Sequence, residues 1–342
     1  KHAIATWSPY TEGVARKWEG WTIEHKAHNA DWIGINPQGL AAVGDTLFLS
    51  LHYNDKLLTI DAETGTVKGE IALPDPSGLA SDGKRLLAVS GTRVVEVNPV
   101  DGSAAPVITN GLSAPVGLAL DAQGNVYVSD WADQMCVKVF DAGGRYLRSI
   151  GRPGGRAWEG PYDSSGLLLP LGVSVDPRGR VWVVENDFSP RRVSCWDGES
   201  GALFFERIGK GGYGGMRNYV MTDDTSQALL FNNLLDLDWE TGRWRVRSTL
   251  WRATHADALF GADPYTRFGS IIHRDGRRFL VHSSMQIYGN LTQISELTDD
   301  GRARPLAAAG QVMNGLPCDN WQQGGTEASP LILENLWTDP RM

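Results

Sequence analysis

Two histidines and a glutamate stand at the same place in separate copies of a repeated phrase. They are His52, His282 and Glu185, each thirteen positions after the anchor residue of its copy. Imidazole nitrogens and carboxylates are ligands for divalent metal ions such as zinc or calcium. A neutral imidazole also exchanges a proton near pH 7, and Tyr53, next to His52, could serve as an acid or base. If the fold brings these residues together, they predict metal binding or acid–base chemistry.

The same count reaches Gly91, Asp130 and Asn232 in the other three copies. The side chains of Asp and Asn commonly accept the backbone N–H groups of a turn. Asp130 and Asn232 therefore have two interpretations, as ligand-binding residues or as turn formers. Gly91 brings no side chain.

A second set of positions differs in charge between the copies. Two residues before the anchor, the first four copies have proline, which sets φ for entry into a strand, whereas the last two have Arg217 and Arg267. Arginine binds carboxylate, sulfate or phosphate groups through paired hydrogen bonds. The two arginines therefore predict an anionic-ligand site. The alternative is that they pair with nearby acids such as Asp223 or Asp263.

Short β-strands are the elements that must position these residues. The anchors recur at a spacing of roughly 40 to 55 residues, which is typical of propeller blades and solenoid repeats. They are Gly39, Gly78, Gly117, Gly172, Tyr219 and Gly269. Each copy has an apolar run, an Asp/Gly turn, an alternating run, a loop and a third run. A fourth strand follows turns such as DAETG at Asp61–Gly65. Four antiparallel strands in six copies predict an all-β, six-bladed β-propeller.

The two clearest copies are PVGLALDAQGNVYVSDWADQMCVKVFD, from Pro115, and PLGVSVDPRGRVWVVENDFSPRRVSCWD, from Pro170. They resemble the NHL repeat, and the resemblance covers about residues 36–310. The segment Gly154–Trp239 is also similar to the propeller portion of large secreted bacterial proteins. Some NHL-like propellers are enzymes, including peptide-amidating lyases that hold a metal in the channel with histidines. The resemblance supports the fold, but the fold alone does not set the function.

In a propeller, the loops after the second strands share one face with the connections between blades. The singled-out positions should therefore surround one mouth of the central channel, a concave place of the kind that binds ligands. Ring closure makes the first and sixth blades neighbours, so we expect His52 and His282 side by side. Insertions at 151–166 and 252–266 bring Trp158 and Tyr265 to this face, where an aromatic ring could stack on a sugar.

Composition narrows the class of protein. The formal net charge is −8 and no basic run occurs, which argues against nucleic acid and anionic membranes as partners. Cys136 and Cys195 fall in third strands, where we expect buried thiols. No transmembrane run is present. The sequence predicts an N-terminal extension over 1–35, the propeller over 36–310 and a tail over 311–342.

We expect the chain to be a mature or excised piece of a secreted or periplasmic bacterial protein, without its signal peptide, and a monomeric propeller within that larger protein. Two functions remain. The first is a binding or scaffold module with an anionic or sugar ligand at the channel mouth, whose partner is a small molecule, a carbohydrate or a protein. The second is a metal-dependent lyase or hydrolase in which His52 and His282 hold the metal and Glu185 completes the site. The sequence favours the first.

Overall fold

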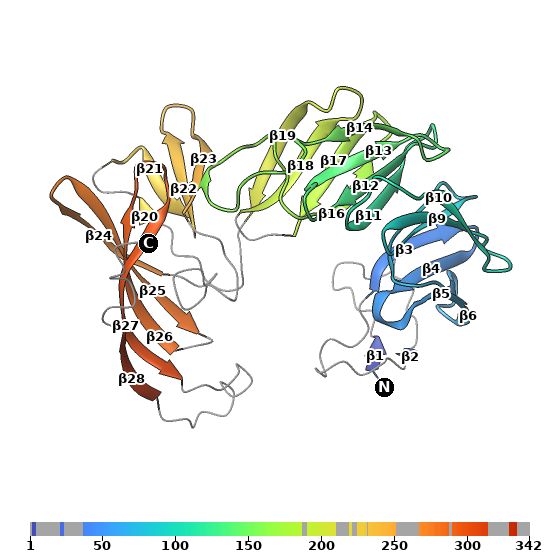
Figure 1. Ribbon diagram of the computed structural model, residues 1–342, viewed down its shortest axis with the longest axis horizontal. Coiled ribbons are helices and arrows are strands. Elements are labelled where there is room, and N and C mark those ends of the chain that lie inside the picture. Colours follow the sequence, from blue (N-terminus) through green and yellow to red (C-terminus); the bar gives the residue numbers. More distant parts are fainter. Residues whose placement is uncertain are drawn as a thin grey trace. The chain divides into compact units, whose positions relative to one another are not determined.

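The computed structural model describes residues 2–4, 21–23, 37–186, 190–209, 219–220, 224–230, 232–250, 267–286, 289–313 and 328–333. Within these residues the backbone forms six sheets of four or five antiparallel strands, and the helical structure is a single 3₁₀ turn, η1 (His52–Asn54) (Figure 1). Among them, no helix has the length and apolar character needed to cross a membrane.

The sheets follow one another along the chain. The first contains β3 (Pro37–Val43), β4 (Thr46–Leu51), β5 (Lys56–Asp61) and β6 (Val67–Ala72). The second contains β7 (Pro76–Ser81), β8 (Leu86–Ser90), β9 (Arg93–Val97) and β10 (Ala104–Ile108). The third contains β11 (Pro115–Leu120), β12 (Val126–Asp130), β13 (Cys136–Phe140) and β14 (Tyr146–Ile150).

The last three sheets continue this pattern, and two of them gain a strand. The fourth contains β16 (Pro170–Val175), β17 (Arg180–Glu185), β18 (Arg191–Asp197) and β19 (Leu203–Gly209). The fifth contains β20 (Tyr219–Val220), β21 (Gln227–Leu230), β22 (Asn233–Asp238), β23 (Arg243–Thr249) and the distant β15 (Gly160–Pro161). The sixth contains β24 (Arg267–Arg274), β25 (Arg277–Gln286), β26 (Gly289–Leu297), β27 (Ala303–Met313) and β28 (Ala328–Leu333).

The predicted fold class is confirmed, because all six copies form a sheet whose first strand begins at or next to the predicted phrase. The six four-stranded repeats fit a six-bladed β-propeller. β27 extends past residue 310, and β28 adds a fifth strand to the sixth sheet. At the N-terminus, β1 (His2–Ile4) and β2 (Trp21–Ile23) pair with each other.

The chain divides into two compact units. Unit 1 comprises Lys1–Gly155, Ser165–Glu185 and Val193–Glu206, and unit 2 comprises Arg156–Ser164, Asn186–Arg192 and Arg207–Met342. Unit 1 thus contains the first three sheets and most of the fourth. Unit 2 contains the fifth and sixth.

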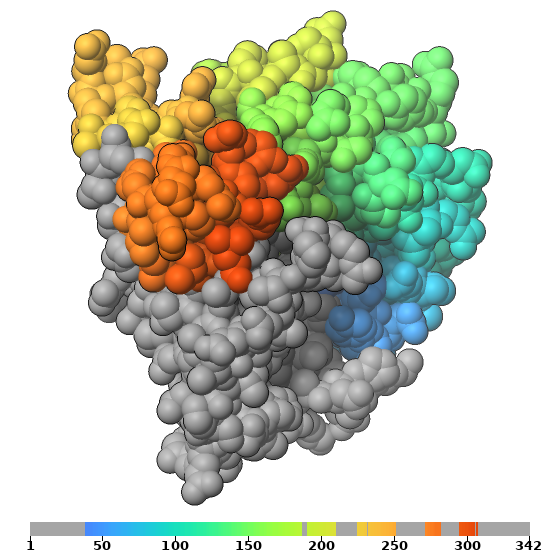
Figure 2. Space-filling model, turned by 60° about the vertical axis from the view of Figure 1, so that its left-hand side comes forward, coloured from blue at the N-terminus to red at the C-terminus, as the bar shows by residue number. Residues whose placement is uncertain are grey.

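In unit 1 the cores lie between successive sheets, because alternate residues of a strand point to opposite faces. Leu86 and Ala88 on β8 pack with Phe48 of the first sheet, whereas Leu87 and Val89 pack toward the third sheet. A strand buried on both faces needs a continuous apolar run, and this is why LLAVS has no polar residue before its last position. Figure 2 shows the second to fourth sheets, teal to yellow-green, as an unbroken surface.

The anchor glycines are required where the first strands of neighbouring sheets pass each other. A Cβ at Gly39 would lie 2.5 Å from the carbonyl oxygen of Ser77, and one at Gly78 would lie 2.6 Å from that of Val116. At Gly117 the distance to the carbonyl oxygen of Leu171 would be 2.0 Å. No Cβ fits at such distances. The glycine of the repeated Pro-x-Gly phrase is therefore needed for the close packing of one sheet on the next.

The third and fourth strands are joined by the predicted Asp-x-x-x-Gly turns. Asp61 Oδ1 accepts the backbone N–H groups of Glu63 and Thr64, and Asp197 Oδ1 accepts those of Glu199 and Ser200. The backbone N–H of Thr64 holds the pKa of Asp61 well below its usual range, and that of Ser200 lowers the pKa of Asp197. In Asp238, the Thr241 hydroxyl is the main cause of the lowered pKa.

These turns predict that the protein loses stability in acid. A carboxyl group can have a lower pKa in the folded chain than in the unfolded chain. Its ionised form then stabilises the fold at pH values above the unfolded pKa, which is about 3.9 for Asp. This stabilisation is lost as the pH falls through the folded pKa. We expect the free energy of unfolding in urea to decrease from pH 5 to pH 3, and Asp61→Asn to show a smaller decrease than the unsubstituted chain. A free energy that stays constant over this range would contradict the assignment.

Candidate functional site

The loops after the second strands and the connections between sheets meet on one face of unit 1. Antiparallel strands require this, because the first and third strands begin where the second and fourth end. We call it the entry face, since the first strand of each sheet begins there. Ser90 Oγ, at the end of β8, donates to the Pro74 carbonyl in the connection before β7, at 2.6 Å. Within unit 1 these loops therefore lie on one face, and a ligand site there stays a prediction.

His52 lies on the entry face, in the turn η1 that follows β4. Its Nδ1 is 3.0 Å from Asp75 Oδ1 and 3.3 Å from the Pro76 carbonyl oxygen. The side chains of His52 and Asp75 are 32% and 59% exposed. The exposed ring of Tyr53 stands edge-to-face to the imidazole, with 5.0 Å between the ring centroids. The first two sheets thus present an imidazole, a carboxylate and a phenol ring together to solvent.

The backbone around His52 is held in an unusual conformation. Asp55 and Asp75 both have positive φ, +52° and +48°, a region that residues other than glycine seldom occupy. The Asp75 N–H donates to Asp55 Oδ1 at 2.9 Å, and the Asp75 carbonyl accepts the Gly91 N–H at 3.0 Å. Such conformations persist where the surrounding structure fixes them, often at ligand sites. The carboxylate of Asp75 is therefore held in place beside the imidazole.

The equal offsets from the anchors do not correspond to equal structural positions. Asp130 and Glu185 pair with the prolines that open their own sheets, Pro115 and Pro170. In the first sheet, however, Pro37 pairs with Leu51, so His52 lies one residue beyond. The cause is turn length, because β3 and β4 are joined by the two residues Gly44 and Asp45, whereas β11 and β12 are joined by five.

His282 is displaced in the other direction. Its Cα partners are Phe268 and Gln293, and β25 continues past it to Gln286, so it does not end a second strand. Ser283 is the residue that pairs with Arg267. Only the backbone is described for His282 and Arg267, and His282 belongs to the other unit from His52. A site shared by the two histidines stays a prediction.

Asp130 is fully buried, with 0% of its side chain exposed, and its carboxylate is occupied by the protein. It accepts the N–H groups of Ser113 at 3.0 Å and Ala114 at 2.7 Å. Its Oδ2 is 2.8 Å from Lys138 Nζ, which also donates to the Gly111 carbonyl. The two N–H donors lie in the connection that precedes β11. Asp130 therefore ties the connection before β11 to the end of β12.

Two further predicted site residues are buried, one at the end of a strand and one in a turn. Glu185 ends β17 and is 5% exposed. Asn232 lies in the two-residue turn between β21 and β22, and its carbonyl accepts the Leu250 N–H at 2.6 Å. Its Oδ1 accepts from the Asn233 side chain at 3.1 Å. These bonds tie the turn to Leu250 and Asn233, and both roles of Asn232 stay predictions.

The 151–166 insertion contributes to the fifth sheet. Gly160 pairs with Thr249 and Pro161 with Ser248 on the edge of that sheet. Trp158 is half-buried in this segment. Arg217 and Tyr265 lie outside the described residues, so their predicted ligand roles stay predictions.

Sequence reasoning missed Asp75 and Trp131. Trp131 follows Asp130 as His52 follows Leu51, and its Nε1–H donates to the Pro170 carbonyl at 2.7 Å. Each ring thus bonds to the proline that opens the next sheet. The signal for Asp75 was its place before Pro76, in the connection that the repeat brings to the entry face.

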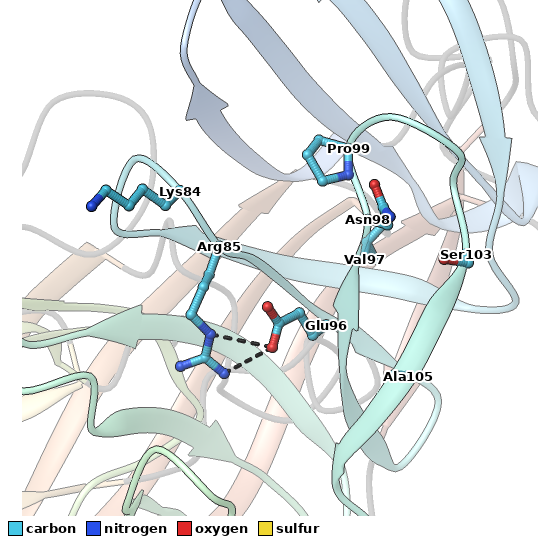
Figure 3. A pocket seen from close by; sticks show the side chains of 8 residues that line it. All are labelled: Lys84, Arg85, Glu96, Val97, Asn98, Pro99, Ser103 and Ala105. Carbon is cyan, nitrogen blue, oxygen red and sulfur yellow. Dashed lines mark hydrogen bonds and ion pairs between the residues drawn. The ribbon is translucent and has the colours of Figure 1, made fainter.

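Cys136 and Cys195 are buried thiols, as predicted, and burial raises the pKa of both. Within the part of the chain that the structure describes, no three His, Cys, Asp or Glu side chains gather as metal ligands. A hollow of about 370 Å³ lies on the opposite side, between the β7–β8 and β9–β10 turns (Figure 3). Its Arg85 and Glu96 bond to each other at 3.0 Å.

No family model matches the chain, and no curated protein matches it. Among solved structures it is similar to hydrazine synthase of Kuenenia stuttgartiensis, with 18% identity, 84% of this chain and 69% of that chain covered, and a TM-score of 0.42. It is similar to a gluconolactonase of Xanthomonas campestris, with 15% identity, 72% of this chain and 82% of that chain covered, and a TM-score of 0.42. It is also similar to virginiamycin B lyase of Staphylococcus aureus, with 15% identity, 79% of this chain and 83% of that chain covered, and a TM-score of 0.38.

Proposed function

We propose that the chain is an NHL-type propeller module of a secreted or periplasmic bacterial protein, and that it binds a carbohydrate or small anionic ligand at the mouth of its channel. The observation that carries this proposal is the His52–Asp75 pair on the entry face. An imidazole held by a carboxylate, partly exposed and beside an exposed aromatic ring, combines a directed polar group with an apolar surface. Ligand sites commonly combine these two features.

The surroundings of the pair support a binding role. Other polar groups on this face, such as the side chains of Asp130 and Ser90, are buried and bonded within the protein. His52, Tyr53 and Asp75 instead keep exposed surface. The backbone contacts of Asp55 and Asp75 hold this group without a ligand, so little conformational entropy is lost on binding.

A glycan array with neutral, carboxylated and sulfated glycans tests the proposal. We expect the chain to bind a subset of these glycans and His52→Asn to weaken that binding about tenfold, the effect of losing about 1.4 kcal/mol of hydrogen bonding. Lys84→Ala, in the β7–β8 turn on the opposite side, is the matched control and should bind normally. An array without binding, or binding that both variants reduce equally, would contradict the proposal.

A metal-dependent lyase or hydrolase is a second candidate, because a carboxylate that holds one nitrogen of a histidine is a common partner of metal-binding histidines. His52 is one such histidine, whereas catalytic zinc takes three protein ligands. The fit is therefore incomplete, and we derive no reaction step through a metal. Stoichiometric zinc or calcium in the purified chain, lost on His52→Asn, would favour this candidate.

A further inference from the structure

The partners of His52 determine which of its ring nitrogens carries the proton. Both oxygens near Nδ1, from the Asp75 carboxylate at 3.0 Å and the Pro76 carbonyl at 3.3 Å, can only accept a hydrogen bond. The hydrogen bond runs to the Pro76 carbonyl, so Nδ1 must donate to it, while the Asp75 carboxylate lies at ion-pair distance from the same nitrogen. In the neutral ring, the other nitrogen, Nε2, is then an acceptor.

The third sheet makes the equivalent contact through a group whose role as hydrogen-bond donor is fixed. The Trp131 indole N–H can only donate, and it bonds to the Pro170 carbonyl at 2.7 Å, as His52 bonds to the Pro76 carbonyl. The two residues occupy equivalent places, each one beyond the partner of its sheet's opening proline. His52 therefore serves as a donor between sheets. It differs from tryptophan in keeping a second nitrogen.

That second nitrogen is available for a ligand. No described residue bonds to His52 Nε2, and the side chain is 32% exposed. Of the two carboxylates beside it, that of Asp55 accepts the Asp75 N–H, and that of Asp75 lies 3.0 Å from His52 Nδ1. In the neutral ring, Nε2 offers a ligand an acceptor beside the exposed ring of Tyr53, and the negative charges of Asp55 and Asp75 close by repel anions.

We infer that this place takes a neutral, polyhydroxylated ligand, a sugar whose hydroxyl donates to His52 Nε2 while its ring lies on Tyr53, and that Asp75 is the residue that positions the imidazole for it. The inference rests on the proposed function and chooses between its two ligand classes. It places carbohydrate, and not an anion, at the first two sheets.

The first test is the tautomer of His52 in the full chain, measured by ¹⁵N NMR of the ring at about pH 8, where a free imidazole is neutral. His52→Asn assigns the signals by their loss. We expect a protonated Nδ1 and an unprotonated Nε2. A ring with the proton on Nε2 would overturn the inference. In Asp75→Gly, which tolerates the positive φ, the proportion of this tautomer should fall, and Asp75→Asn, which keeps an acceptor oxygen, should restore part of it.

The second test uses glucose, galactose and mannose together with their uronic acids and their amino sugars, which share a ring but differ in charge. We expect the neutral sugars to shift the His52 ring signals, and the uronic acids to shift them at least tenfold less at equal concentration. His52→Trp places the third sheet's residue here, so it should keep the fold but abolish the shifts of the neighbouring Tyr53 signals.

The outcomes separate the two proposals. If only the uronic acids or amino sugars shift signals on the entry face, the binding function stands and the inference is wrong. If none of the nine compounds shifts any of these signals, the inference is wrong, and the glycan array alone decides the proposed function.

Discussion

Asp130→Ala is expected to lower the free energy of unfolding by about 3–5 kcal/mol, as happens when one partner of a buried ion pair is removed. The carboxylate is fully buried, and the Lys138 side chain beside it is only 10% exposed. Without Asp130, the N–H groups of Ser113 and Ala114 would lose their acceptor, and the Lys138 ammonium would lose its counter-charge and keep the Gly111 carbonyl. Urea unfolding followed by circular dichroism measures the effect.

Two variants control this experiment. Glu70→Ala removes a surface partner of Lys56, at 2.7 Å, and should cost at most about 1 kcal/mol. Adding Lys138→Met to Asp130→Ala should recover part of the stability, because it removes the uncompensated buried charge. If Asp130→Ala costs no more than Glu70→Ala, the carboxylate does not have the structural role assigned to it.

Gly117→Ala should also destabilise the protein, by about 3 kcal/mol, the upper end of what overpacking costs. Its Cβ would lie 2.0 Å from the Leu171 carbonyl oxygen and 3.1 Å from Ser129 Oγ, so the third and fourth sheets would have to separate. Gly143→Ala is the control, since its Cβ would lie 3.5 Å from the nearest atom. Thermal unfolding compares the two. Equal melting temperatures would show that the first strands do not pack this closely.

The strands could be predicted from the sequence because their apolar residues are set by burial on both faces. LLAVS and VYVSD have no other stable place than between two sheets. The repeat also marks three close approaches, because Gly39, Gly78 and Gly117 recur where one first strand passes the next. For the same reason the buried thiols of Cys136 and Cys195 followed from their strand positions.

The site was less predictable because counting residues along the chain does not give strand pairing. The turn between β3 and β4 is shorter than that between β11 and β12, and this moves His52 to the place of Trp131 instead of Asp130. A shift of one residue along a strand places a side chain on the opposite face of the sheet. The pairing of His52 with Asp75 joins two sheets, and no repeat within a single copy encodes such a contact.

The buried ion pair of Asp130 and Lys138 was a second feature that the repeat pattern did not predict. Lys138 stands in the run CVKVF at a position that alternation assigns to a buried face. For its partner Asp130, at the end of a second strand, the sequence left a ligand-binding and a turn-forming role open. The two observations together indicate an ion pair, since a lysine is seldom buried without a partner.

The most direct test of the account is a crystal structure of the chain with the glycan that binds best on the array. We expect a sugar hydroxyl within hydrogen-bond distance of His52 Nε2, with the sugar ring against Tyr53. A glycan bound in the hollow between Lys84 and Pro99, or anywhere else away from the entry face of the first two sheets, would contradict it.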